Sequence, residues 1–171
     1  MISAILLAAG QSQRMKGQNK LLKHYKGKYL INHILNTLVK SKVNNIFLVL
    51  GFQNLKVRKI IIKSKKIQCI YNKKYKSGLS SSIQAGLNKI SKKNIGFLIV
   101  HADMPLISKG IINILCSAVK NKDKEIFVPV HKKKLGNPLA FKYSMIKSLK
   151  KIKGDRGAKK LIKSNKSKVQ L

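Results

Sequence analysis

Acidic residues are scarce in this chain. Its 171 residues contain only four, Asp103, Asp123, Glu125 and Asp155, against 38 lysines and arginines, which gives a formal net charge of +34. The lysines are spread over every segment, and aromatic residues make up only 6%, too few for a base-stacking surface. We therefore expect no nucleic-acid partner and interpret the charge as a solvated surface that steers small anionic ligands toward the protein.

Cysteine pairs, zinc-binding patterns and long apolar runs are also missing. Cys69 and Cys116 form no CxxC pair, which fits a reduced, cytoplasmic chain with two structural thiols. The four histidines show no HxxxH-type spacing, so we expect no zinc site. No apolar run approaches the length of a membrane span. The apolar start has no basic segment before it and reaches Gly10 after eight residues, which indicates a first strand rather than a signal peptide.

Short apolar runs alternate with amphipathic stretches along the chain. At this length we expect a single domain over residues 1–171, with a polar, frayed tail at 163–171. The apolar runs predict strands at 3–7, 45–50, 67–71, 95–101 and 125–130, with a short extra strand at 139–141. The amphipathic stretches predict helices at 28–43, 53–62, 80–90, 108–119, 143–152 and 157–162.

Continuous apolar strands separated by helices predict a mostly parallel sheet with helices on both faces. This is a three-layer α/β/α, Rossmann-like fold. Ligands of such folds lie beyond the carboxyl ends of the strands. The unusual motifs of this sequence follow the first, third, fourth and fifth predicted strands, so we expect one site at that edge of the sheet.

The first strand runs into a loop of small residues that carries two spaced cations. The segment from Leu7 to Leu22 is LAAGQSQRMKGQNKLL, which is neither a Walker A nor a GxGxxG pattern. Small residues let the backbone approach a ligand closely, and successive N–H groups can cradle an anion. Arg14 and Lys20 add full positive charge beside this cradle. The loop alone therefore predicts a polyphosphate site.

Two further motifs follow later strands. Gly78 begins the segment GLSSSIQAGL, where one serine can cap the helix and the others offer donors for an anion or a polar base edge. The segment HADMPLI begins at His101 and places Asp103 directly after a buried strand. A carboxylate there can hold Mg²⁺ together with substrate phosphates. We interpret His101 as a structural residue.

The last two motifs are GNPLAF, from Gly136, and GDRGAK, from Gly154. Taken alone, the first fits a hairpin turn, and in the second Asp155 could simply cap the last helix. Together with the three earlier segments, however, they span Leu7 to Lys159 in one order. In that order the five segments resemble the signature of the MobA-like nucleotidyltransferases, and within that superfamily they are most similar to the molybdenum cofactor cytidylyltransferases.

This resemblance implies a fold of the nucleotide-diphospho-sugar-transferase type and a role for each motif. Arg14 and Lys20 would be the catalytic cations that neutralise phosphate charge, and Asp103 would bind Mg²⁺ as the cofactor. The implied nucleotide-binding residues are Leu7, Ala8, Ala9, Gly10, Ser12, Arg14, Lys20, Gly78, Ser80, Ser81 and Ser82. The implied acceptor-binding residues are Gly136, Asn137, Pro138, Asp155 and Arg156.

The resemblance also implies a reaction. A nucleotidyl group, CMP from CTP because of the Ala8-Ala9 pair, moves onto a phosphorylated, molybdopterin-type acceptor, and pyrophosphate leaves. A sugar-phosphate or polyol-phosphate acceptor is the alternative, as is a non-catalytic cofactor-binding accessory with a molybdoenzyme or chaperone partner. Members of the family continue into an Asp-rich segment that supplies a second carboxylate. The printed sequence has none before Leu171, which favours the accessory alternative or leaves the metal to Asp103, phosphates and water.

Overall fold

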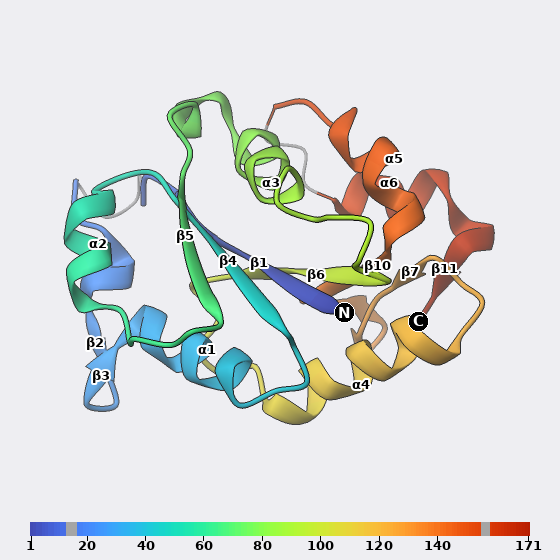
Figure 1. The fold of residues 1–171 in the computed structure, drawn as a ribbon, viewed down its shortest axis with the longest axis horizontal. Coiled ribbons are helices and arrows are strands. Elements are labelled where there is room, and N and C mark those ends of the chain that lie inside the picture. Colours follow the sequence, from blue (N-terminus) through green and yellow to red (C-terminus); the bar gives the residue numbers. More distant parts are fainter. Residues whose placement is uncertain (13–16, 155–157) are drawn as a thin grey trace.

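A seven-stranded sheet runs through the middle of the molecule (Figure 1). The computed structural model describes residues 1–12, 17–154 and 158–171. The strand order is β11-β7-β10-β6-β1-β4-β5. One part of the sheet is parallel and consists of β1 (Ile2–Ala8), β4 (Asn45–Leu50), β5 (Ile67–Tyr71) and β6 (Gly96–His101). In the other part, β10 (Leu139–Lys142) is antiparallel to its neighbours β6 and β7 (Ile126–Phe127), and β11 (Val169–Gln170) is parallel to β7.

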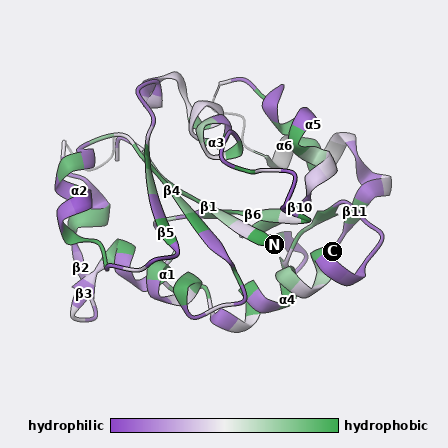
Figure 2. Ribbon diagram, in the orientation of Figure 1, coloured by the Kyte–Doolittle hydropathy of each residue, from purple (hydrophilic) through white to green (hydrophobic). Residues whose placement is uncertain are grey.

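Helices cover both faces of this sheet, which confirms the predicted three-layer α/β/α fold. Below the sheet in Figure 1 are α1 (Leu30–Val39) and α4 (Lys109–Asn121), and α2 (Asn54–Ile60) packs into the same apolar layer at the β5 side. Above it are α3 (Leu79–Leu87), α5 (Ile146–Lys150) and α6 (Lys159–Ser164). Figure 2 shows hydrophobic and hydrophilic residues alternating around α1, α2 and α4, as expected for helices with one buried face.

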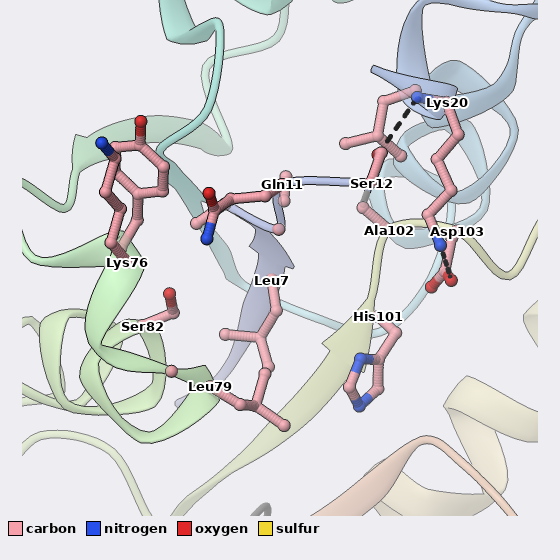
Figure 3. Close-up of a pocket in the computed structure, with 16 residues that line it drawn as sticks. Leu7, Gln11, Ser12, Lys20, Lys76, Leu79, Ser82, His101, Ala102 and Asp103 are labelled. Carbon is pink, nitrogen blue, oxygen red and sulfur yellow. Dashed lines mark hydrogen bonds and ion pairs between the residues drawn. The ribbon is translucent and has the colours of Figure 1, made fainter. Parts of the chain in front are cut away.

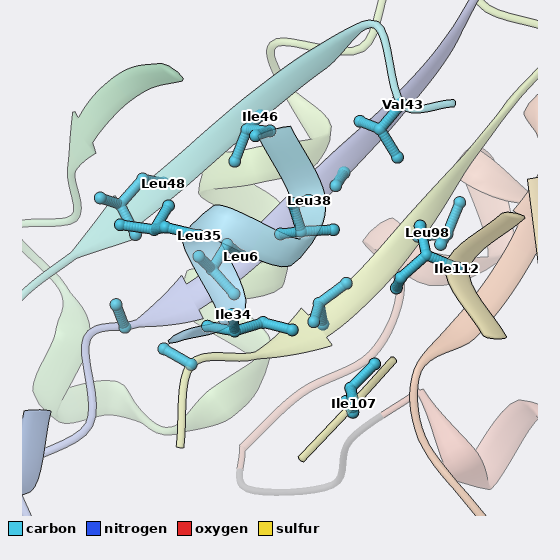
Figure 4. Close-up of a cluster of buried hydrophobic side chains, with 14 of the residues drawn as sticks. Leu6, Ile34, Leu35, Leu38, Val43, Ile46, Leu48, Leu98, Ile107 and Ile112 are labelled. Carbon is cyan, nitrogen blue, oxygen red and sulfur yellow. The ribbon is translucent and has the colours of Figure 1, made fainter. Parts of the chain in front are cut away.

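The central strand β1 explains how the two apolar layers form. All seven of its residues are buried, and successive side chains point to opposite faces. Leu6 packs with Leu35 and Leu38 of α1 on one face (Figure 4). Ile5 packs with Ile83 of α3 on the other. Because β1 is hydrogen-bonded to a strand on each side, its carboxyl end is a firmly held point from which the following loop starts.

The parallel strands lie where the sequence predicts them. β4 and β5 have the predicted bounds, β1 is one residue longer at each end, and β6 begins one residue later. The predicted helix at 28–43 begins later, because the chain first forms a hairpin of β2 (His24–Tyr25) and β3 (Lys28–Tyr29). Gly27, with a φ of +77°, allows the tight turn between these strands.

The chain after α4 departs most from the predictions. The predicted strand at 125–130 is only two residues long as β7, and a separate exposed hairpin of β8 (Val130–His131) and β9 (Lys134–Leu135) follows. The tail expected to be frayed instead forms β11, which pairs with β7. Lys168 Nζ lies 2.6 Å from Glu125 Oε2, and Val169 packs against the apolar layer beneath α3 and α5. Backbone pairing and one ion pair therefore hold a segment whose polar sequence predicts a free end.

Among the described residues, no helix is long and apolar enough to cross a membrane.

Candidate active site

A cavity of about 420 Å³ opens at the carboxyl ends of β1 and β6 and at the start of α3 (Figure 3). This is the edge of the sheet at which the sequence predicts a site. Eight of the predicted nucleotide-binding residues line it: Leu7, Ala8, Ala9, Gly10, Ser12, Lys20, Gly78 and Ser82. Asp103, the predicted metal ligand, lines it as well.

The turn that carries Lys20 is fixed by side chains of its own loop. Asn19 is buried; its Oδ1 accepts a hydrogen bond from Leu21 N at 3.0 Å, and its Nδ2 donates one to Phe52 O at 3.1 Å. Ser12 Oγ accepts a hydrogen bond from Lys20 N at 3.3 Å. The backbone at residue 20 is therefore hydrogen-bonded to Ser12 in the loop after β1, and its neighbour Asn19 is hydrogen-bonded to the segment after β4. The Lys20 side chain thus extends into the cavity from a defined position.

Lys20 and Asp103 form an ion pair in the wall of the cavity. Lys20 Nζ lies 2.5 Å from Asp103 Oδ2, and the two side chains are 43% and 37% exposed. The residues come from segments 83 positions apart, and the sequence assigned them separate roles toward phosphate and metal. Because both remain partly exposed, water screens their attraction, and a ligand can replace either partner at little cost.

Two opposing effects act on the Asp103 carboxyl group. Partial burial raises its pKa, but the hydrogen bond and the charge of Lys20 lower it more, so the pKa lies below its usual value. Asp103 is therefore ionised at neutral pH. An ionised carboxylate beside a half-exposed ammonium group is suited to exchange that cation for a metal ion bound to a polyanion.

The opposite wall is the start of α3. Gly78 precedes the helix with a φ of +93°, a conformation that a residue with a side chain rarely adopts. No serine hydroxyl caps the helix, so our expectation of a capping serine is wrong: the helix begins at Leu79, and the serines lie in its first turn. Asn72 Nδ2 donates to Ser81 Oγ at 2.9 Å and to Ser82 Oγ at 3.1 Å.

Only one of the three serines reaches the cavity. Ser82 lines it, whereas Ser81 Oγ lies 2.8 Å from both Lys74 O and Gly78 O, donates its one proton to these carbonyl oxygens, and so braces the turn before the helix. Ser80 is buried, and its N–H donates to Gly154 O at 3.0 Å. This bond joins the second motif to the fifth, which lie far apart in the sequence.

The structure adds lining residues that the sequence analysis did not select. Tyr75 and Lys76 belong to the segment between β5 and α3, and Gln11 belongs to the first loop. Figure 3 shows Lys76 on the side of the cavity opposite Lys20, so positive charge flanks the space from two elements. The position of Lys76 two residues before Gly78 is the signal that could have identified it.

A second, smaller cavity of about 270 Å³ adjoins the first, and its lining is largely apolar: Leu79, Ile83, Ile99, His101, Asn137, Leu139 and Ala158. Of the predicted acceptor-binding residues, Asn137 lines it, and Gly136 and Pro138 flank Asn137 in the chain. The predictions for Arg14, Asp155 and Arg156 concern residues outside the described part of the chain.

Comparison with known proteins places this site in a family. Residues 4–169 match the MobA-like NTP transferase domain. This chain belongs to that family. The family accordingly extends over both cavities and all seven strands, which confirms the resemblance on which the motif roles were based.

Individual relatives agree with this assignment. The chain is 30% identical over 146 residues to an adenosylcobinamide-phosphate guanylyltransferase of Methanocaldococcus jannaschii, covering 80% of this chain and 72% of the relative. It is 31% identical over 134 residues to a probable molybdenum cofactor guanylyltransferase of Clostridium perfringens, covering 78% of this chain and 61% of the relative. The chain likewise spans less than two thirds of the length of several other curated relatives.

A solved structure has the same fold. The crystal structure of Rv0371c from Mycobacterium tuberculosis superposes with a TM-score of 0.87 at 22% identity, covering 99% of this chain and 85% of the other. At this identity the likeness shows the fold alone.

Metal-binding side chains of this MobA-like domain are few. The described residues contain no group of three or more His, Cys, Asp or Glu side chains that could form a complete metal cage. Asp103 is the only carboxylate among the described residues that line the larger cavity. One ionised carboxylate facing a polyphosphate-sized space fits Mg²⁺, which takes one or two protein carboxylates and completes its shell with phosphates and water.

The cysteines contribute nothing to the site. Burial raises the pKa of the Cys116 thiol to about 11 and also raises that of Cys69. Cys116 belongs to the apolar layer below the sheet, and the partly buried Cys69 packs against it. Both thiols are therefore protonated at neutral pH and act as small apolar groups, in agreement with the structural role expected from the sequence.

Proposed function

We propose that this protein is a Mg²⁺-dependent nucleotidyltransferase that transfers a nucleotidyl group from a nucleoside triphosphate to a phosphorylated acceptor and releases pyrophosphate. The observation that carries this proposal is the meeting of Lys20 and Asp103 at 2.5 Å in the wall of the larger cavity. A bound magnesium–triphosphate complex can use both a cation that neutralises phosphate charge and a carboxylate that holds the metal ion, and in this cavity two such side chains lie in contact.

Asp103 would hold the metal ion, together with substrate phosphates and water. When bound, the ion would neutralise phosphate charge in the transition state. Lys20 would then leave Asp103 and contact the triphosphate, and Lys76 would approach it from the opposite wall. The loop that follows β1 would bring its N–H groups against the phosphates, because Gly10 is exposed and has no side chain, and the small side chains of Ala8 and Ala9 line the cavity beside it.

The proposed chemistry is an in-line displacement. An oxygen of the acceptor phosphate forms a bond to the α-phosphorus of the nucleotide, the bond to the β-phosphate oxygen breaks, and pyrophosphate leaves with both bonding electrons. The attacking phosphate is already ionised at neutral pH, so no general base is needed. The protein contributes positioning and charge stabilisation, which together account for most of the acceleration in reactions of this type.

Two nucleotides are candidates for the donor. The Ala8-Ala9 pair resembles the cytidylyltransferase branch and favours CTP. The two relatives described above are named guanylyltransferases, which supports GTP as the second candidate. Ala9 is buried and lines the cavity. Tyr75 and Gly51 pack beside it, so this wall of the cavity has little room to change shape.

We propose a pterin-type phosphate as the acceptor. The apolar lining of the smaller cavity, with Asn137 and His101 as its polar side chains, supports a flat ring system that packs its faces on apolar side chains better than a polyhydroxylated body. A sugar phosphate or polyol phosphate is the alternative, and such an acceptor would need more hydrogen-bonding side chains than this lining supplies.

The test is pyrophosphate release from each of CTP, GTP, ATP and UTP, with molybdopterin, a sugar phosphate and a polyol phosphate as acceptors. We expect turnover with molybdopterin and one preferred nucleotide, and loss of turnover when EDTA removes the metal. Nucleotide binding without turnover on any acceptor would contradict the enzymatic proposal and favour a cofactor-binding accessory. Turnover with only the sugar phosphate or the polyol phosphate would contradict the pterin-type acceptor and favour that phosphate instead.

A further inference from the structure

The two cavities meet at one polar side chain. Of the residues that the structure describes, only Leu79 and His101 line both cavities. Leu79 offers no polar side-chain atom, whereas the imidazole ring of His101 carries two nitrogen atoms that can donate or accept hydrogen bonds. His101 is therefore the side chain positioned to contact groups that lie in the two cavities at once.

The backbone holds His101 at this junction. It is the last residue of β6, and it pairs with Leu7 of β1 in the parallel ladder. It therefore lies next to the start of the loop that follows β1. Figure 3 shows its ring directed away from the Lys20–Asp103 pair. The ring thus points away from the proposed metal-binding carboxylate, although only Ala102 lies between the two residues in the chain and His101 still acts electrostatically on Asp103 and helps to lower the pKa of its carboxyl.

We propose that His101 positions the acceptor by donating a hydrogen bond to a non-attacking oxygen of its phosphate. This inference rests on the proposed function. If the nucleotide occupies the larger cavity and the acceptor body the smaller one, the new phosphorus–oxygen bond forms at their junction. His101 neither gains nor loses a proton in that step; it holds the acceptor phosphate so that another of its oxygens faces the α-phosphorus.

The role requires a donor at this point and so distinguishes His101 from a purely structural residue. Loss of one hydrogen bond to a charged group weakens binding roughly 10- to 100-fold. The loss should fall on the acceptor and leave the nucleotide largely unaffected, because Lys20 and Lys76 face the other end of the larger cavity. Glutamine and asparagine place an amide donor near one or the other imidazole nitrogen, so one of them should restore part of the binding.

The experiment uses the whole protein with Mg²⁺, a CTP or GTP analogue that has a methylene group between the α- and β-phosphates, and inorganic phosphate as the acceptor probe. Imidazole NMR signals are followed during a phosphate titration in 0.3 M salt. We expect a saturable shift of the His101 signal, while the exposed His24 and His131 stay unchanged. Phosphate should bind roughly 10- to 100-fold more weakly to His101→Ala, with partial recovery in His101→Gln or His101→Asn.

Three results would overturn the proposal, and they differ in what they leave standing. Unchanged phosphate binding in His101→Ala, with analogue binding intact, would remove the role of His101 and leave the proposed function. Loss of analogue binding in His101→Ala, with folding confirmed by circular dichroism, would show that His101 contacts the nucleotide rather than the acceptor. Failure of the wild-type protein to bind either analogue would overturn the proposed function and this inference together.

Discussion

The two cavities differ in charge and in the part of the sheet that forms them. The larger one has Lys20, Lys76 and Asp103 in its wall and follows strands that are parallel and buried. The smaller one is mainly apolar and borders β10, which runs antiparallel to β6. Charge therefore concentrates where the proposed triphosphate lies, and shape and apolar contact dominate where the proposed acceptor lies.

This difference indicates that the larger cavity serves triphosphate binding and the smaller cavity serves acceptor recognition. Triphosphates are chemically the same in every nucleotide, and the groups proposed to bind them sit on turns tied to β1 and β6. Acceptors differ in shape, and the residues proposed to meet them follow short strands and an exposed hairpin. Substitutions on the charged side should thus affect catalysis strongly, and substitutions on the apolar side should affect mainly acceptor choice.

The largest effect is expected for Asp103→Asn, which removes the only described carboxylate of the larger cavity. Turnover at saturating Mg²⁺ should fall about 10²- to 10³-fold, because the charge that holds the metal against the phosphates is lost. Pyrophosphate release measures this. The matched control is Asp123→Asn, which makes the same change at an exposed turn and should stay within twofold of the wild type; an equal drop in the two variants would refute the assignment.

Lys20→Met should have two opposite effects. Turnover and nucleotide affinity should fall, turnover by about 10²-fold, since a cation facing the phosphates is lost. Without nucleotide, however, Mn²⁺ should bind to Asp103 up to about fivefold more tightly, because the competing ammonium group is gone and an exposed ion pair contributes at most about 1 kcal/mol. Calorimetry with Mn²⁺ tests this, and Lys23→Met serves as the control at an exposed neighbour.

A pair of glycines compares the packing of the two regions. A Cβ atom added at Gly51 would lie 2.5 Å from Tyr75 Cβ and 2.8 Å from Ala9 Cβ, whereas one at Gly136 would lie 3.0 Å from its nearest neighbour, Pro129 O. Gly51→Ala should destabilise the protein by about 1–3 kcal/mol and weaken nucleotide binding, because it displaces two lining residues. Gly136→Ala should cost less than about 1 kcal/mol. Urea unfolding measures the stability of both variants. Equal losses of unfolding free energy would contradict the difference in packing between the two regions.

The smallest effect concerns the pH dependence of the ion pair between Lys168 and Glu125. Hydrogen bonds from Lys168 and then Ser144 lower the pKa of Glu125, which ties β7 to the C-terminal segment. A lowered folded-state pKa stabilises the fold above the unfolded value of about 4.3, and that contribution disappears as pH falls through the folded value. Glu125→Gln should therefore be less stable than the wild type at pH 7, by under about 1 kcal/mol, and this difference should shrink as pH falls below about 4.3 and through the folded value. A difference of the same size at pH 7 and in acid would contradict this.

The sequence was sufficient for the parallel half of the fold. Asn45–Leu50 is apolar on both faces and ends before Gly51, and Ile67–Tyr71 is a short, mainly apolar run that ends before Asn72, so their bounds can be read locally. The orientation of β10 and the pairing of β11 with β7 depend on contacts between distant segments, which no local pattern contains. The polar tail was expected to be frayed for the same reason: backbone pairing requires no apolar side chains.

In the candidate active site too, single residues could be selected from the sequence, but contacts between distant residues could not. Asp103 could be selected because it is one of four acidic residues and directly follows a buried strand, and Lys20 and Gly78 could be selected because they belong to the loops that follow predicted strands. Their ion pairing and the place of His101 between two cavities follow from strand order and could not be predicted. The serines at 80–82 illustrate the difference, since the resemblance implied that all three bind the nucleotide whereas the turn of the helix brings only Ser82 to the cavity.

The most direct test of the account is calorimetric binding of magnesium complexes of CTP and GTP at salt concentrations from 0.1 to 0.5 M. A chain of net charge +34 attracts any polyanion, so affinity alone is uninformative. The account predicts one bound nucleotide per chain, at least about tenfold preference for one base, and retention of that preference at 0.5 M salt. Several bound nucleotides per chain, with equal affinities that collapse together as salt rises, would contradict it.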